Sequence, residues 1–457
     1  MRSRTRWLIG WVCAALAILP TTARAQNLGR PVVEHPLPLM WAERDEGFYF
    51  GMEALIMRMN NALDSQVVAV RGLWDETGYI RGSGNQTVDI LDGRLTTTPF
   101  ITTLLANPGT SGQFLGSGAV ALTTQDVGGD KFVPGSRFTL GYRLRNGIAF
   151  EGNYMSLVAA RQTATAGILP PRTGGVGLDL SNSFISAPFF NASPYLAGAV
   201  QDVVSNVMLL PTNGGGVVSL VTPGAQNGAN QVLTDDATID GLIANRGFFM
   251  AAFGIFNGAE IMEQDLRQRF ASSELNMRVP IFQGEVTRTY WTGGLRYMGS
   301  EERYRLRIVD FDINSNAGPD SWMVYSNKIK NHYYGVQSGL GTEAYLGYGF
   351  AFSVDAKVGV AAENSKANVE VERGDGLYSL KHSNNQFQVA PIVQGGAYVW
   401  WYPIEGVQLR AGYEFLGIFN ARRSPNPIDF DLGRLQPKYE NMFMSIDGFT
   451  LGVAFIF

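Results

Sequence analysis

Cysteine is all but absent from this sequence. The only one, Cys13, lies in an apolar N-terminal stretch that follows three arginines and precedes the small-residue site Ala23-Arg24-Ala25. These features predict a signal peptide over residues 1–25, so the exported chain would contain no cysteine. Disulfides, thiol catalysis and cysteine–metal sites are therefore excluded for the exported chain.

Long apolar runs and charged residues are also scarce. After the predicted signal no run approaches the ~18 apolar residues that a membrane helix needs, and a closed β-barrel is then the remaining way to span a bilayer. Charged residues make up 17% of the chain, below the ~25% usual in soluble domains. Removing the signal takes away four arginines and no acid, so the net charge changes from −4 to −8. Such a chain is not a general nucleic-acid binder.

Glycine, with 54 residues, and aromatic residues, at 12%, are abundant, which is typical of β-barrels. The last segment, 448–457, reads GFTLGVAFIF and alternates with a period of two. A strand of this kind ending in Phe predicts export to the bacterial outer membrane, with outer-membrane lipid and the barrel assembly machinery as partners. The residues expected to face lipid and to carry the assembly signal are Phe449, Leu451, Val453, Phe455 and Phe457.

The rest of the chain contains similar alternating segments, each of about the ten residues that a membrane strand needs. With the last strand there are eleven: 47–57, 137–145, 148–154, 268–279, 286–298, 302–313, 331–346, 350–360, 387–401, 405–417 and 448–457. Single-chain barrels have an even number of strands, so one more is expected, and residues 247–257 are the candidate. We therefore predict an all-β fold, a transmembrane antiparallel up-and-down barrel of about 12 strands with long extracellular loops.

Loop lengths give the expected orientation. Short connections near Gly299, Gly347 and 403–406 are placed in the periplasm, and the long connections 314–330, 363–386 and 418–446 are placed outside. A periplasmic lead is expected over 26–46, before a barrel over 47–457. Two further segments rich in Gly, Thr, Asn and Pro, 58–135 and 159–246, are predicted as large external loops or as plugs folded into the lumen.

In their order along the chain, several short motifs resemble the beta-barrel porin-7 family of bacterial outer-membrane proteins. They include SRFTLGYRL at 136–144, PFFN at 188–191, SELN at 273–276, GLRYMGSE at 294–301 and NHYYGVQ at 331–337, together with segments 49–57, 148–154, 410–422 and 428–429. The resemblance implies an outer-membrane barrel and assigns no definite role.

Charged residues on the polar side of the alternation are predicted to line the lumen, because a charge facing lipid at mid-depth costs about 2–4 kcal/mol. The predicted lining residues are Arg137, Arg143, Arg145, Glu151, Glu274, Arg278, Arg296, Arg303, Arg305, Arg307, Asp355, Lys357, Arg410 and Glu414. With Glu53 and Glu343 added, ten cations face six anions. A water-filled pore with such a wall would favour anions, whereas arginine–carboxylate networks could instead fill a narrow lumen.

Two functions therefore remain open: porin-like passive diffusion of small polar or anionic solutes, and a closed structural or surface-interaction barrel. No enzyme is expected, because none of His35, His332 and His382 precedes a serine by two residues, the spacing that would pair them on one strand. No cofactor or metal is expected either. The acidic segment 310–321 lacks the Gly and Glu that a calcium-binding loop requires. Arg373-Gly374-Asp375 could suggest cell adhesion, but a tripeptide of common loop residues arises easily by chance.

Overall fold

The computed structural model describes residues 46–75, 113–169, 172–174, 177–179, 182–189, 208–211, 218–221, 231–233, 259–284, 286–309, 318–319, 322–377, 379–404 and 406–457. The predicted signal peptide, nearly all of the predicted lead and the candidate strand 247–257 lie outside these residues. Among the described residues, no helix is long and apolar enough to cross a membrane.

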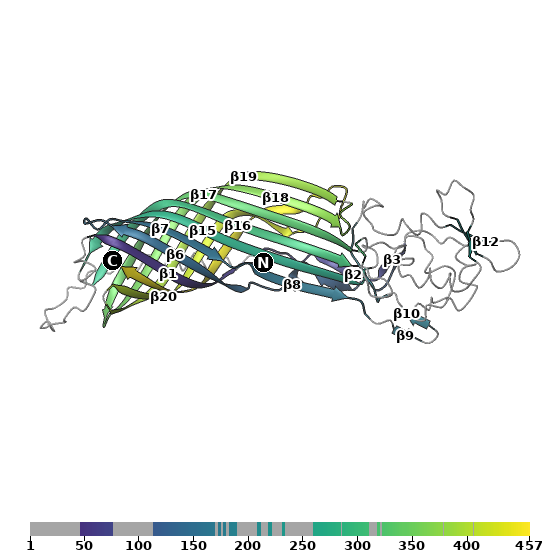
Figure 1. Ribbon diagram of the computed structural model, residues 1–457, viewed down its shortest axis with the longest axis horizontal. Helices are drawn as coiled ribbons and strands as arrows, with labels where there is room; N and C mark the ends of the chain where they lie inside the picture. Colours follow the sequence, from purple (N-terminus) through teal and green to yellow (C-terminus); the bar gives the residue numbers. More distant parts are fainter. Residues whose placement is uncertain are drawn as a thin grey trace, which may run out of the picture.

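Eleven strands form one antiparallel sheet that closes on itself, which confirms the predicted all-β barrel (Figure 1). The strands are β1 (Gly47–Met59), β6 (Phe132–Arg143), β7 (Ala149–Leu157), β8 (Ala160–Gly167), β15 (Ile261–Gln283), β16 (Thr287–Val309), β17 (Trp322–Gly347), β18 (Phe350–Arg373), β19 (Ser379–Ile404), β20 (Val407–Asn426) and β21 (Lys438–Ile456). Strands β15 to β21 pair in chain order, β21 pairs with β1, and the ring returns through β6 and β7 to β15.

Strands β7 and β8 follow one another along the same edge of β15, so the eleven strands occupy ten positions around the ring. One predicted turn is wrong. Segments 286–298 and 302–313 are a single strand, β16, and Gly299 pairs with Ala271 on one side and His332 on the other. A glycine inside a paired strand was read as a turn. Joining the two segments gives an even number of wall positions from the described strands alone.

The strands are much longer than a bilayer requires. Strands β15 to β19 have 23 to 26 residues, whereas about 9–11 residues span the membrane. The short turns and the C-terminus share one end, and β2 (Val67–Arg71) lies near the other (Figure 1). By the predicted orientation, the end with the short turns is periplasmic and about half of each long strand extends outside.

These outer halves were predicted as loops, and that prediction is wrong for most of 314–330, 363–386 and 418–446. Strand β17 begins at Trp322, β18 continues to Arg373, and β20 continues to Asn426. The reason is a reversal of the pattern above the bilayer. In β18 the outer half places Asn364, Lys366, Asn368, Glu370 and Glu372 on the outer face, while Ser365, Ala367, Val369 and Val371 are buried inside. That is the pattern of a soluble barrel.

The two predicted loop segments also contribute to the wall. Segment 58–135 contains the end of β1 and the start of β6, and segment 159–246 contains β8. The small, polar residues of β8 gave no hydrophobic signal. The remaining elements are β3 (Leu73–Asp75), β4 (Gln113–Leu115), β5 (Val120–Thr123), η1 (Thr124–Val127), β9 (Arg172–Gly174), β10 (Gly177–Asp179), β11 (Ile185–Ser186), β12 (Met208–Pro211), β13 (Val218–Val221) and β14 (Gln231–Leu233).

A belt of exposed apolar side chains surrounds the periplasmic half of the barrel. Its members come from nearly every wall strand and include Phe48, Met52, Ile56, Leu140, Leu275, Leu295, Val336, Leu340, Phe352, Val354, Val358, Val360, Val399, Phe449 and Leu451. Water would strongly disfavour so continuous an apolar surface, whereas acyl chains match it. The belt is therefore the lipid-facing surface, and Phe449, Leu451, Phe455 and Phe457 are exposed on it as predicted.

Inside the barrel, glycines leave room for aromatic rings to lie along the wall. Tyr398 lies directly across from Gly412 in the β19–β20 register, and the Arg410 guanidinium lies 4.3 Å from the Tyr398 ring centroid. A Cβ added at Gly412 would overlap Tyr398 Cδ1 and lie 2.5 Å from the backbone oxygen of Ala397. Neither the ring nor the backbone can give way without disturbing its neighbours.

We therefore expect Gly412→Ala to destabilise the barrel by about 1–3 kcal/mol, measured as a shift in the denaturant midpoint of tryptophan fluorescence. Gly51→Ala is the matched control, because its Cβ would lie 3.6 Å from Thr139 Cβ, an ordinary contact. Equal midpoints for the two variants would show that the wall at Tyr398 adapts freely.

Candidate functional site

The lumen holds most of the charged residues that the sequence assigned to it. The residues on the inner side of their strands are Arg137, Arg143, Glu151, Glu274, Arg278, Arg296, Asp355, Lys357, Arg410 and Glu414. They come from six strands and lie in the periplasmic half, at the level of the lipid-facing belt. The alternation of the membrane segments therefore predicted this part of the site correctly.

Four predicted lining residues are not in the lumen. Arg303, Arg305 and Arg307 lie on the outer face of β16, because Glu302, Tyr304, Leu306 and Ile308 occupy its inner face. The prediction placed Arg296 and Arg303 on the same side by assuming a turn at Gly299, whereas a continuous strand puts odd and even positions on opposite faces. Arg145 lies in the β6–β7 turn, where it is 77% exposed and pairs with Glu46.

This correction removes the positive bias of the predicted lumen. Of the predicted set, six cations remain inside: Arg137, Arg143, Arg278, Arg296, Lys357 and Arg410. Six carboxylates face them: Glu53, Glu151, Glu274, Glu343, Asp355 and Glu414. The charges of the set cancel, so an anion-selecting wall no longer follows from them.

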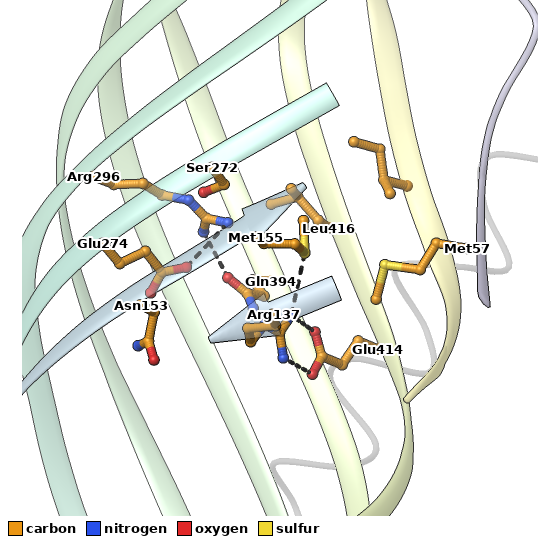
Figure 2. Close-up of a pocket in the computed structure, with 11 residues that line it drawn as sticks. Met57, Arg137, Asn153, Met155, Ser272, Glu274, Arg296, Gln394, Glu414 and Leu416 are labelled. Carbon is orange, nitrogen blue, oxygen red and sulfur yellow. Dashed lines mark hydrogen bonds and ion pairs between the residues drawn. The ribbon is translucent and has the colours of Figure 1, made fainter. Parts of the chain in front are cut away.

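The centre of the network is Arg137, which bridges two carboxylates from different strands. Its two terminal nitrogens each lie 2.5 Å from a Glu414 carboxylate oxygen (Figure 2). Nη1 also donates to Glu53 at 3.1 Å. Arg410 donates to the other oxygen of Glu53 at 2.5 Å. Bidentate arginine–carboxylate pairs are strong and directional, so they fix β1, β6 and β20 relative to one another across the lumen.

A second group lies beside the first, centred on Glu274. Arg296 and Lys357 reach its carboxylate at 3.3 and 3.0 Å, and Gln337 donates to it at 2.8 Å. Arg296 also donates to Gln394 at 2.6 Å (Figure 2). The group joins β15 to β19 across the barrel interior.

A third group lies nearer the periplasmic mouth. Tyr49 donates to Glu151 at 2.5 Å, Arg278 pairs with the same carboxylate at 3.2 Å, and the Arg278 guanidinium packs on Tyr290 at 4.3 Å. Tyr402 donates to Glu343 at 2.6 Å. Each of these carboxylates therefore has a partner, so the inner charges act as cross-links.

The space left between these groups is small. A pocket lies among Arg137, Glu274, Arg296 and Glu414, with Met57 and Leu416 on its outer side (Figure 2). The volume open to the centre of a water molecule is about 20 Å³. That is room for one or two waters and for no larger solute.

An apolar layer lies directly above the charged groups, toward the outside. It includes inward side chains from almost every wall strand: Leu55, Met57, Met59, Val133, Met155, Leu157, Ala160, Phe270, Met298, Tyr333, Ala361, Ala390, Ile392, Leu416, Ile418, Ala421, Met444 and Ile446. All of them are at least nine-tenths buried. Within the described residues, this layer places apolar side chains where a solute would need polar partners.

A second polar layer follows, and sequence reasoning missed it. Arg423 is 1% exposed. It donates through Nε to both Glu302 oxygens at 3.1 and 3.2 Å and through Nη1 to Asn60 Oδ1 at 2.9 Å. Glu363 accepts from Gln388 at 2.7 Å and from the Arg422 backbone at 3.1 Å. Bulges in β20 turn two consecutive arginines inward, which a strict alternation cannot predict.

A further apolar core lies at the outer end of the described barrel. Residues of β2, β5, β11 and the 427–437 connection pack against the inner faces of β15 to β18, and the core includes Val68, Leu122, Ile185, Phe189, Met262, Tyr304, Leu306, Ile308, Met323, Tyr325, Val369, Val371, Ile428, Leu432 and Leu435. The described lumen is thus filled by alternating polar and apolar layers.

Three residues from the discarded motifs have structural partners. His332 lies on the outer face and its Nδ1 is 2.9 Å from the Tyr297 hydroxyl. Arg373 and Asp375 pair with each other in the β18–β19 turn.

The sequence matches no protein-family model and no curated protein. Among solved structures, it is similar to the outer membrane protease OmpT from Escherichia coli, with 8% identity and a TM-score of 0.34 over 90% of this chain and 97% of that one. It is also similar to the CymD monoaromatic hydrocarbon channel (8%, TM-score 0.23, 95% of each chain) and to the Pseudomonas putida toluene transporter TodX (9%, TM-score 0.21, 93% and 92%). Likenesses at this level assign no activity. The closed sheet and its apolar belt make this chain a β-barrel of the bacterial outer membrane.

Proposed function

We propose that the chain is a closed, non-catalytic outer-membrane barrel that conducts no solute and presents its outer half for interaction at the cell surface. The observation that carries the proposal is the filled lumen. Charged cross-links occupy the membrane level, and the apolar layer from Leu55 to Ile446 lies across the barrel above them.

Opening such a lumen would be costly. A solute would have to separate Arg137 from Glu414, whose side chains are 12% and 4% exposed, and an unpaired buried charge costs about 3–5 kcal/mol. It would then have to cross the apolar layer without polar partners. The packing thus supports a closed, rigid barrel more than a passage for solutes.

The long outer strands support the second half of the proposal. They form a packed structure beyond the bilayer, with the Tyr325 core inside and polar side chains outside. A barrel that only anchored itself in lipid would not need this extension, so a surface role accounts for it.

Porin-like diffusion of small polar or anionic solutes is the second candidate. The polar lumen at membrane level favours it, because Arg137, Glu274 and their partners would suit water and ions if the apolar layer were displaced. Membership of the porin-7 family, and contacts with outer-membrane lipid and the barrel assembly machinery through the row Phe449 to Phe457, stay part of the proposal.

Single-channel recording separates the two candidates. The protein, refolded in detergent and shown to be heat-modifiable on gels, is added to a planar bilayer under a salt gradient. We expect no discrete conductance steps, because the charged and apolar layers formed by the described residues fill the lumen. A bacterial porin in the same bilayers is the positive control.

Discrete steps with a reproducible reversal potential would instead contradict the closed barrel and support diffusion. In that case the Glu variants of Arg303, Arg305 and Arg307 should leave the reversal potential unchanged, since these side chains are outside. Variants of Arg137 should change it.

A further inference from the structure

Four cations form a continuous row on the outer wall, one on each of four neighbouring strands. The register pairs Arg267 on β15 with Arg161 on β8 and with Arg303 on β16, and it pairs Arg303 with Lys328 on β17. All four side chains lie on the outer face, since the residues next to them in each strand are inside. We name Arg161, Arg267, Arg303 and Lys328 the basic row.

Like charges directly opposite on neighbouring strands are destabilising, and this wall does little to offset them. On the outer face, over the basic row and the two residues to either side of it, strands β8 and β15 to β18 carry eight cations and three carboxylates, Asp265, Glu301 and Glu370. Asp265 pairs with Arg161, and Glu301 pairs with Lys328 at 3.1 Å. Within the described part of the chain, no ion pair joins Arg267 or Arg303 to a carboxylate.

A second observation points to an anionic ligand. The Nε atom of Arg305, two residues beyond Arg303 on β16, is shielded from solvent and has no hydrogen-bond partner among the described residues. Among the residues that the structure describes, Arg303 has the Ser326 hydroxyl, at 3.2 Å, as its one hydrogen-bond partner. The guanidinium groups of this wall therefore retain donors for a ligand with several acceptor oxygens.

The height of the row on the barrel indicates which ligand. Four residues along the strands toward the membrane lie Gly299 and His332, which face each other across β16 and β17. Two residues further lie Tyr297 and Tyr334, whose rings are in contact. Below them begins the lipid-facing belt with Leu295 and Val336. Tyrosines mark the interface of a bilayer. Six residues separate Tyr297 from Arg303, about 20 Å along the strand and less along the tilted barrel axis. The row therefore lies beyond the tyrosine level, on the headgroup side of the bilayer.

We propose that the basic row binds the phosphate groups of a phosphorylated glycolipid in the outer leaflet, whose acyl chains lie against the belt below. Arginine forks match phosphate oxygens. The bound phosphates relieve the repulsion between Arg267 and its neighbours and fix the barrel at a set depth in the membrane. This surface is continuous with the lipid contact already described, which favours a lipid over a soluble anion.

The test compares binding of diphosphorylated lipid A with that of the same lipid without phosphates. The full chain is purified in detergent, and affinity is measured by thermophoresis alongside the thermal midpoint. The variant is Arg267→Gln/Arg303→Gln/Lys328→Gln. Arg145→Gln/Arg434→Gln/Lys438→Gln is the control, because it removes the same charges from exposed sites elsewhere.

We expect the parent and the control to bind the phosphorylated lipid equally, and the basic-row variant to bind it at least about tenfold more weakly. The lipid should raise the thermal midpoint of the parent, and high salt should reduce that increase. The parent measurement does not depend on whether the variant folds. Equal affinity for the dephosphorylated lipid, equal losses in variant and control, or full competition by inorganic phosphate at the same concentration would each overturn the proposal.

Discussion

Replacing Arg137 by alanine should destabilise the barrel by about 3–5 kcal/mol, the usual effect of leaving buried charges without their partner. Arg137 joins Glu414 to Glu53 through a single guanidinium, with both terminal nitrogens on Glu414, and Glu414 is 4% exposed. Without the guanidinium, Arg410, at 3.7 Å, is the one cation left beside Glu414 among the described residues. The cost is large because the carboxylate cannot turn toward bulk water.

The measurement is the denaturant midpoint of the refolded barrel, read from tryptophan fluorescence and from gel mobility without heating. Arg145→Ala is the matched control: its pair with Glu46 is exposed, and exposed pairs contribute only about 0–1 kcal/mol. Similar losses for both variants would show that the Arg137 group is not a cross-link.

A double variant distinguishes lost pairing from lost packing. In Arg137→Met/Glu414→Gln both charges are removed and the volumes are roughly kept, so much of the stability should return. Failure to recover would mean that the remaining Glu53–Arg410 pair also depends on Arg137.

The sequence predicted the membrane half of this fold well, for a simple reason. Lipid accepts only apolar side chains, so each strand there has a sharp period of two, as in 350–360 and 448–457. The same period correctly placed Arg137, Glu274, Arg296, Lys357 and Glu414 inside. One misread glycine, Gly299, was enough to reverse the face of Arg303, Arg305 and Arg307.

The outer half could not be predicted in the same way. There the wall has water outside and packing inside, so apolar residues such as Val369 and Val371 change faces relative to the belt. Strand β8 is too polar to be recognised from a hydrophobic alternation. The bulges of β20 turn Arg422 and Arg423 inward together. Whether the lumen is open or filled depends on which residues share a height on strands far apart in the sequence, and only the register shows that.

The last prediction concerns Tyr325, the aromatic centre of the outer core. Its side chain is fully buried, its hydroxyl donates to Pro427 O at 3.2 Å, and it accepts from the Asp429 backbone at 3.0 Å. Tyr325→Ala should cost about 3–5 kcal/mol and release the 427–437 connection. We expect new cleavage in the outer half when intact cells are treated with protease.

Tyr334→Ala is the control on the same strand, because Tyr334 faces outward and is largely exposed; it should leave the cleavage pattern unchanged. The membrane half of Tyr325→Ala should stay heat-modifiable, since the apolar layer around Met298 and Tyr333 is a separate cluster. If the outer core and the apolar layer each close the lumen independently, the variant should show no conductance even with its outer core loosened. Conductance in Tyr325→Ala, and not in Tyr334→Ala, would show that the outer core is what closes the lumen. The inner apolar layer would then admit water once that core is loosened.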